Sequence, residues 1–269
     1  MHAYVINLAR SVERRAHITA ELKKTGLDYE IVTAVDGREL DLSDPAIVDP
    51  ALASKTVSMA GAAGCAMSHL NAYKKMIADG LDAALVLEDD VILPADLGSL
   101  ADAVADQLAG PEVVLLSYST PYPPFKLSRE GSVNLPSARL LALPVDINQW
   151  LMSSGAYIIT REACERMLKC GLPVRVPIDD WRFFYQEGIL DRVRCVAPMP
   201  LPNNAKLVST IGSYTLGNGL KGRLLWPLVN RKIPVLHQAL SYRRQRIQRR
   251  WYRSEIVDVP FIEKPSRLG

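Results

Sequence analysis

The first 120 residues alternate between short apolar segments that are typical of buried strands and longer segments with the spacing of a helix. Four segments are predicted to be strands, and they cover residues 2–8 (HAYVINL), 28–35 (DYEIVTAV), 82–93 (DAALVLEDDVIL) and 112–119 (EVVLLSYS). The helices expected between them cover residues 11–26, 61–80 and 100–110. Strands that alternate with helices are joined by crossovers and favour a parallel sheet. We therefore expect an α/β fold with a doubly wound, mostly parallel central sheet flanked by helices.

The second half of the chain is less regular. Residues 120–140 are rich in Pro, Ser and Gly, and they are typical of a loop or of short edge strands. Residues 153–171 then read as a strand that runs into a helix, residues 179–188 as a short helix and residues 192–202 as an extended segment. These patterns predict one large domain with a variable second half.

Charge is distributed unevenly along the 269 residues. Residues 1–205 hold 19 Lys and Arg against 26 Asp and Glu, whereas residues 206–253 hold eleven basic residues and no acidic one. Residues 240–253 (LSYRRQRIQRRWYR) are compatible with an amphipathic cationic helix, which suits an anionic membrane surface. A solvated cationic helix and a nucleic-acid tail are the alternatives. We expect a globular domain over residues 1–215 and a basic helical segment over residues 216–269.

Two classes of segment are not indicated by the composition. No apolar run approaches the ~20 residues of a membrane-spanning helix, and the first residues do not have the pattern of a signal peptide, so we expect a cytoplasmic protein. The four cysteines form no C-x-x-C pair and are interpreted as reduced, mostly buried thiols.

Three consecutive acids interrupt the most hydrophobic segment of the chain, AALVLEDDVILP. Side chains alternate along a strand, so Glu88 and Asp90 are expected on one face, while Asp89 points away. Two carboxylates in that arrangement suit one hard cation, Mg²⁺ or Mn²⁺. The alternative is a solvated strand end, but apolar residues on both sides favour a crevice.

The ordered set of motifs resembles glycosyltransferase family 25, the lipooligosaccharide galactosyltransferase-like group with a GT-A fold. YVINLARSVERR resembles the opening I-N-L-x-R-x-x-x-R of that family, and GAAGCAMSHLNAYKKM resembles its G-x-x-G-C-x-x-S-H helix. VLEDDV resembles its acidic metal motif, with Glu in place of the first Asp, and TAVDG, GAYIITREACERML and PIDDW resemble three further segments. The resemblance covers about residues 3–212.

The resemblance implies a role for each segment. Glu88 and Asp90 would bind the metal ion, Mn²⁺ or Mg²⁺. Asp89 would contact the nucleotide-sugar or support the loop. The other implied contacts to a nucleotide-sugar are Asn7, Leu8, Arg10, Arg15, Ser68, His69 and Ser209. Arginines near a helix N-terminus suit a pyrophosphate, although an exposed first helical turn would have the same sequence.

Asp179 and Asp180 are the candidate catalytic residues. An inverting transfer needs a carboxylate that takes the proton from the acceptor hydroxyl, and either Asp could be this base. Asp is also a favoured N-cap, so one of the two could begin the short helix while the other reacts. We favour Asp179 because it matches the P-x-D segment. Trp181 could stack on an acceptor sugar or pack in the core.

These features together predict a metal-dependent inverting glycosyltransferase that moves a hexose, with galactose favoured, from a UDP-sugar to a hydroxyl of a lipooligosaccharide or other glycan. The expected partners are the UDP-sugar donor, a glycan or glycolipid acceptor and an anionic membrane surface on the inner face of a bacterial inner membrane, rather than nucleic acid. The alternatives are transfer of glucose or another sugar to a protein or polysaccharide, a nucleotidyltransferase, and a nucleotide- or membrane-binding protein without activity.

Overall fold

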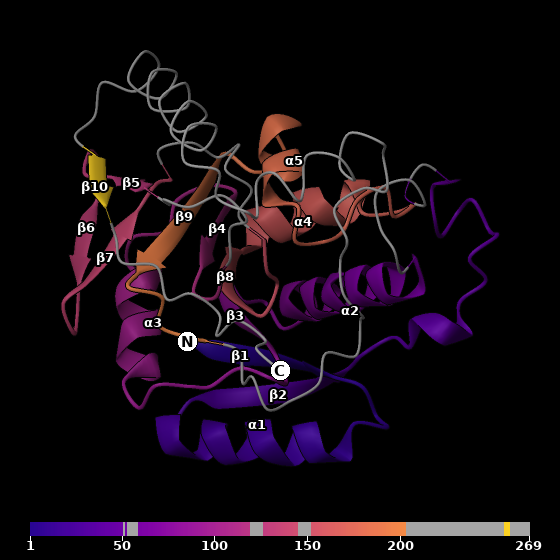
Figure 1. The fold of residues 1–269 in the computed structure, drawn as a ribbon, viewed down its shortest axis with the longest axis horizontal. Helices are drawn as coiled ribbons and strands as arrows, with labels where there is room; N and C mark the ends of the chain where they lie inside the picture. The colour runs from indigo at the N-terminus through magenta and orange to yellow at the C-terminus, as the bar shows by residue number, and fades with distance from the viewer. Residues whose placement is uncertain (51, 53–58, 119–125, 145–151, 203–255, 259–269) are drawn as a thin grey trace, which may run out of the picture.

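A central sheet of eight strands carries helices on both of its faces (Figure 1). The computed structural model describes residues 1–50, 52, 59–118, 126–144, 152–202 and 256–258. The strands are β1 His2–Asn7, β2 Asp28–Thr33, β3 Ala83–Glu88, β4 Glu112–Leu115, β5 Lys126–Ser128, β6 Val133–Leu135, β7 Arg139–Ala142, β8 Ala156–Thr160, β9 Arg192–Ala197 and β10 Ile256–Asp258. The helices are α1 Val12–Thr25, η1 Gly37–Glu39, α2 Met59–Ala78, α3 Leu97–Ala105, α4 Arg161–Cys170 and α5 Trp181–Gln186.

The strand order in the sheet is β2-β1-β3-β8-β4-β9-β7-β6. β1 pairs in parallel with β2 and β3, and β4 pairs in parallel with β9. β8 is antiparallel to both β3 and β4, and β7 is antiparallel to β9 and β6. Six strands therefore point one way while β7 and β8 run against them, so the sheet is mostly parallel as predicted. The sequence did not predict that β8 would separate β3 from β4.

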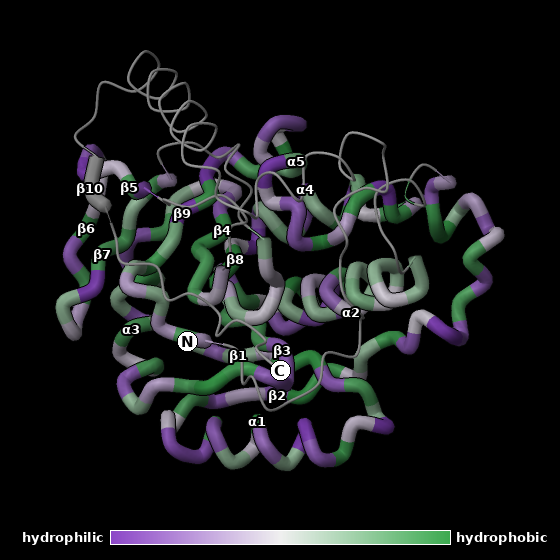
Figure 2. Tube along the Cα trace, in the orientation of Figure 1, coloured by the Kyte–Doolittle hydropathy of each residue, from purple (hydrophilic) through white to green (hydrophobic). Residues whose placement is uncertain are grey.

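Two hydrophobic clusters cover the two faces of the sheet. Ile18 and Leu22 of α1 pack with Leu97 and Leu100 of α3 on one face. On the other face, α2, α4 and α5 contribute buried side chains such as Met76. Figure 2 shows the hydrophobic colour concentrated on the central strands, whereas α1 is banded with hydrophilic residues. Both faces are thus covered, as a doubly wound sheet requires.

Two boundaries differ from the prediction. α2 spans Met59–Ala78 rather than residues 61–80, so Gly61 and Gly64 both lie inside the helix. A Cβ at Gly64 would lie 2.6 Å from the backbone nitrogen of Gly37, so this glycine allows the helix to contact the loop after β2. β3 ends at Glu88, and the residues that follow form a turn. The alternation expected for the acidic triplet is therefore wrong beyond Glu88.

A short strand late in the sequence, β10, pairs with β5 in a second, two-stranded sheet. The backbone of β10 pairs antiparallel with β5, with Val257 opposite Leu127. The predicted domain boundary at residue 215 and the predicted basic helix at residues 240–253 lie outside the described residues. None of the described helices is long and apolar enough to span a membrane.

Candidate functional site

A cavity of about 260 Å³ opens at the carboxyl ends of β1 and β3. The two strands are adjacent and parallel, with Ile6 opposite Glu88 in the register, so the residues that end both strands meet at one edge of the sheet. The loop after β2 and one side of α2 complete the lining. Ligands of open α/β sheets bind at such an edge, because the strand ends and loops there present polar groups.

Asn7 and Asp89 connect the two strand ends. The Asn7 side chain is buried, and its Nδ2 donates to Asp89 Oδ2 at 2.6 Å and to the Ser11 carbonyl oxygen at 3.3 Å. Burial raises the pKa of Asp89, whereas Arg14 and the hydrogen bond from Asn7 oppose that rise. Asp89 lines the cavity and does not point away from it, which corrects the expected alternation.

Arg14, which sequence reasoning missed, bridges two acids of the triplet. Its Nε lies 2.9 Å from Asp89 Oδ1, and its NH2 nitrogen lies 2.6 Å from Asp90 Oδ2. Arg14 is largely buried and lines the cavity, whereas Arg15 is exposed and lies outside the cavity lining. The second arginine of I-N-L-x-R-x-x-x-R falls on Arg14, so the motif spacing held the signal. A phosphate contact by Arg15 stays a prediction.

Two further arginines lie at the cavity around Asp36. Arg10 contacts Asp36 Oδ2 at 2.9 Å, and Arg38 contacts the same atom at 2.6 Å. The hydrogen bonds from Arg38, together with the charge of Arg10, lower the pKa of Asp36 to about 2. Leu8 also lines the cavity, as does Arg38, which the sequence had not singled out.

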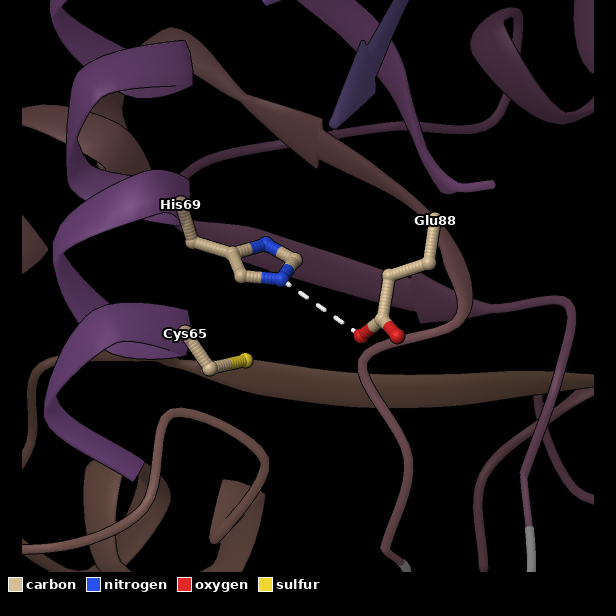
Figure 3. Close-up of side chains that lie close together, drawn as sticks. All are labelled: Cys65, His69 and Glu88. Atoms are coloured by element: carbon tan, nitrogen blue, oxygen red, sulfur yellow. Dashed lines mark ion pairs between the residues drawn. The ribbon is translucent and has the colours of Figure 1, made fainter. Parts of the chain in front are cut away.

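Glu88 is the last residue of β3 and faces α2. Its Oε1 accepts a hydrogen bond from Ser154 Oγ at 2.5 Å and lies 3.6 Å from His69 Nε2. Burial would raise the pKa of Glu88, but His69, Ser154 and the charge of Arg14 together hold it below its usual value. Figure 3 shows Cys65 and His69 extending from α2 toward this carboxylate.

Ser68 and His69 lie in the middle of α2, which begins at Met59. Ser68 Oγ accepts from the backbone nitrogen of Val35 at 2.8 Å and donates to the Gly64 carbonyl oxygen, so Ser68 joins α2 to the loop after β2. His69 is fully buried. Both residues line the cavity.

Asp90 is partly buried, and it lies outside the cavity lining next to the Glu88 and Asp89 carboxylates. Burial and the negative charge of Glu88 raise its pKa to about 6, although Arg14 counteracts them. Within the described part of the chain, Asp90 Oδ1 has no hydrogen-bond partner. A buried carboxylate oxygen without a donor is costly, so this atom is suited to a cation or to a ligand donor.

The two candidate bases have different environments. Asp180 begins α5, and its Oδ1 accepts from the backbone nitrogen of Phe183 at 3.2 Å, as an N-cap does. Asp179 is buried, and its Oδ2 accepts from the backbone nitrogen of Ser153 at 3.2 Å. Burial and the charge of Glu88 raise the pKa of Asp179 to about 6. The charge of Glu88 therefore acts on Asp179, which links this residue to the acidic triplet.

Residues 153–155 connect Asp179 to Glu88. The backbone of Ser153 has φ 122°, a strained value for a residue with a side chain, and its carbonyl oxygen accepts from Trp181 Nε1 at 3.0 Å. The Gly155 carbonyl oxygen accepts from the Glu88 nitrogen at 2.8 Å. Trp181 is fully buried against Tyr157, which supports the core interpretation of this residue. Ser209 lies outside the described residues.

Comparison with known proteins relates this chain to one family of glycosyltransferases. The model of glycosyltransferase family 25 (LPS biosynthesis protein) matches residues 1–181. A glycosyltransferase 25 family member from Anopheles gambiae is 28% identical over 195 residues, which is 67% of this chain and 31% of that protein. The lacto-N-neotetraose biosynthesis glycosyltransferase LgtE from Neisseria meningitidis is 35% identical over 97 residues, which is 36% of this chain and 34% of that protein.

A third relative is named as inactive. The inactive glycosyltransferase 25 family member 3 from Mus musculus is 35% identical over 97 residues, which is 33% of this chain and 16% of that protein. The chain thus aligns with no more than 34% of the length of any of these three relatives. The family model covers well over half of this chain, including both the acidic triplet and Asp179. The chain therefore belongs to glycosyltransferase family 25.

Proposed function

We propose that this protein transfers a hexose from a UDP-sugar to a hydroxyl group of a glycan, with inversion at the sugar carbon. One observation carries the proposal: three acids and three arginines meet at the carboxyl ends of two parallel strands, in a chain of this family. The acids are Glu88, Asp89 and Asp90, and the arginines are Arg10, Arg14 and Arg38. A nucleoside diphosphate with a divalent cation needs this combination of charges.

The donor pyrophosphate would lie near the arginines. Arg10 and Arg38 share Asp36, so the two guanidinium groups together keep a net positive charge at the cavity. Guanidinium groups bind phosphate oxygens in a bidentate way, and Asp36 holds these two in place before the ligand arrives. Leu8, Ser68 and His69 line the cavity and are proposed neighbours of the nucleotide-sugar, as is Asn7 through its hydrogen bond to Asp89. Arg15 and Ser209 remain further candidates.

The acidic residues fit a hard divalent cation, Mn²⁺ or Mg²⁺. Glu88 and Asp90 are the proposed ligands, because Asp90 Oδ1 is buried without a partner and the negative charge of Glu88 raises the pKa of Asp90. When bound, such a cation would act as a Lewis acid that neutralises charge on the departing diphosphate. Arg14, which pairs with both Asp89 and Asp90, would hold these two carboxylates in position.

Asp179 is the proposed base. Its raised pKa of about 6 lies close to neutral pH, where a carboxylate can accept a proton and still be mostly ionised. In the proposed step the acceptor oxygen attacks the sugar carbon, its proton passes to Asp179, and the bond to the diphosphate oxygen breaks. Asp180 would act through α5, since its carboxylate caps that helix.

The nature of the donor and acceptor is a finer part of the proposal. Galactose and a lipooligosaccharide acceptor are favoured because the family model is described as an LPS biosynthesis protein and one relative is named for lacto-N-neotetraose biosynthesis. A lipid-linked acceptor would make membrane docking by the basic residues 206–253 useful. Binding to anionic vesicles, compared with a chain that ends at residue 205, tests this part.

Two measurements test the main proposal. Thermal unfolding with UDP should show a stabilisation that requires Mn²⁺ or Mg²⁺, and UDP release should be faster with UDP-galactose than with UDP-glucose. Asp82→Asn is the matched control for Asp90→Asn, because the Asp82 side chain is exposed just before the same strand. A UDP-induced stabilisation that is the same with and without the cation would refute the metal-dependent transferase, and turnover of no UDP-sugar would refute the enzyme.

A further inference from the structure

Cys65, His69 and Glu88 form a cluster whose chemistry differs from that of the other acids. One sulfur, one imidazole nitrogen and one carboxylate oxygen from these residues lie within 4.8 Å of one another. Cys65 and His69 are four residues apart on α2 and therefore lie on the same face of the helix, while Glu88 ends β3 opposite them (Figure 3). All three residues line the cavity, so a small ion can reach them.

His69 supplies the second observation. This side chain is fully buried, yet its Nε2 has no hydrogen-bond partner among the described residues, because Glu88 Oε1 at 3.6 Å is too far away for a hydrogen bond. The other ring nitrogen, Nδ1, is 2.6 Å from the Tyr157 hydroxyl, which in turn is 2.7 Å from the Tyr73 hydroxyl. When Nδ1 carries the proton and donates it to Tyr157, the Nε2 lone pair points toward Cys65 and Glu88. Metal-binding histidines are oriented by a partner on the second nitrogen in this way.

We propose that Cys65, His69 and Glu88 form a binding site for a thiophilic divalent cation such as Zn²⁺, which shares Glu88 with the hard-cation site at Glu88 and Asp90 but adds a sulfur and an imidazole ligand. Sulfur and imidazole ligands select zinc over magnesium or manganese. Tetrahedral zinc with bonds of about 2.0–2.3 Å places its ligand atoms about 3.5 Å apart. The three atoms therefore need to approach one another by only about 1 Å, which the side chains can achieve by rotation.

Charge balance also favours occupancy by a divalent cation. Glu88 contributes one negative charge to the cluster, and Cys65 contributes a second when it binds as a thiolate. Binding of the cation forms bonds to Sγ, Nε2 and a carboxylate oxygen, and the Cys65 thiol proton is released to the solvent. Two negative ligands then neutralise the two positive charges of the ion. Ser154, whose Oγ lies 3.9 Å from Cys65 Sγ and 2.5 Å from Glu88 Oε1, is placed to support the same ligands.

The two cation sites share Glu88, and this has a consequence that rests on the proposed function. A zinc ion held by Cys65 and His69 takes Glu88 away from Asp90, so Zn²⁺ would inhibit transfer in competition with Mn²⁺. This would make the cluster a metal-sensitive control on the donor site. The competition requires an active transferase, whereas the binding of Zn²⁺ alone does not.

The test therefore measures binding without any substrate. The whole chain is titrated with Co²⁺, whose thiolate complex shows a sulfur-to-cobalt charge-transfer absorption, and then with Zn²⁺, which should displace it. We expect a one-to-one complex with that band in the wild-type protein. Cys65→Ser should lose the band and weaken Zn²⁺ binding by at least about a hundredfold, because even loss of an outer partner of a ligand costs 10–100-fold. His69→Gln should also weaken it.

Two controls make the outcome specific. Cys170→Ser removes a partly exposed thiol on α4, outside the cluster, and should leave the band unchanged. Asp90→Asn should also retain the band, since Asp90 belongs only to the hard-cation site. Circular dichroism checks that each variant is folded, and Cys65→Ala replaces Cys65→Ser if the latter is not. A Co²⁺ complex without the band, or equal Zn²⁺ affinity in folded Cys65 variants and wild type, would overturn the proposal, whatever the protein does to UDP-sugars.

Discussion

Two short runs of acids, residues 88–90 and residues 179–180, follow apolar segments and look alike in the sequence. In the first run, Glu88 faces α2 while Arg14 holds Asp89 and Asp90 together. In the second run, Asp180 caps a helix, whereas Asp179 is buried with a raised pKa. In the first run, two neighbouring acids thus share Arg14 as their counter-ion. In the second run, one acid caps a helix and its neighbour is the proposed base. The role of each carboxylate therefore depends on the residues that pack against it and not on its neighbour in the sequence.

The largest expected effect is on the turnover rate and comes from a substitution in the first run, residues 88–90. Asp90→Asn keeps the shape of the side chain but removes a proposed metal ligand, so we expect the rate of UDP-sugar turnover to fall about a thousandfold, or about 4 kcal/mol in the barrier. Initial rates of UDP release at saturating Mn²⁺ measure this effect. Asp82→Asn should leave the rate unchanged. Normal transfer by the Asp90→Asn variant would mean that the first run is structural.

Removal of the shared counter-ion should affect stability. Arg14→Ala leaves two largely buried carboxylates without their cation, so we expect a loss of about 3 kcal/mol in the free energy of unfolding. Arg15→Ala, one residue away and exposed, should change it by less than about 0.5 kcal/mol. Urea unfolding of both variants at neutral pH compares the two. Equal stability would show that Arg14 does not hold the first run together.

The second run predicts a separation of roles. Asp179→Asn should lower kcat about a hundredfold, while the metal-dependent stabilisation by UDP stays the same, because a base acts on the acceptor and not on the nucleotide. Asp180→Asn should keep kcat within a factor of about three, since Asn also caps helices well. Steady-state kinetics give kcat for each variant, and thermal unfolding with and without UDP and the cation gives the stabilisation. The reverse pattern would identify Asp180 as the base.

The raised pKa of Asp179 predicts a pH effect on stability. The folded state holds this proton up to a pH of about 6, whereas the unfolded chain loses it near a pH of about 3.8, so the folded state binds more protons between these values. This contribution therefore lowers stability as pH rises from about 4 to about 6, by up to about 3 kcal/mol, and is constant above that range. The unfolding free energy of Asp179→Asn should not show this decrease between pH of about 4 and about 6. If the difference in unfolding free energy between Asp179→Asn and wild type is the same at pH 4 and pH 7, the pKa of Asp179 is not raised in the folded state.

The smallest effect concerns the cap. Asp180→Ala removes the acceptor for the backbone nitrogen of Phe183, so we expect a loss of about 1 kcal/mol in unfolding free energy. Thermal unfolding of this variant and of Asp180→Asn, which retains an acceptor, isolates the cap. A loss of several kcal/mol in both would show that Asp180 has a role beyond capping.

Much of the fold was predictable because it depends on local patterns. The strands at β1, β2, β3 and β4 follow from apolar runs, and Gly26 ends α1 with φ 66° as a C-terminal glycine should. The partners of the acids were less accessible. Arg14 contacts residues 75 and 76 positions away, and nothing local distinguishes it from Arg15 apart from the motif spacing. Cys65, read as a buried reduced thiol, is a free cysteine but lines the cavity.

The sequence by itself determined the elements and the chemical groups that they carry, because hydrophobic periodicity and capping residues act over a few positions. It also determined that three acids would interrupt an apolar segment, although the structure ends β3 at the first of them, Glu88. Only the tertiary structure decided that β8 lies between β3 and β4, which brings Ser153 and Ser154 beside the acids. It also decided which of two adjacent acids is buried. Burial, ion pairs and pKa values depend on contacts between residues distant in the chain, and such contacts exist only once the sheet has assembled.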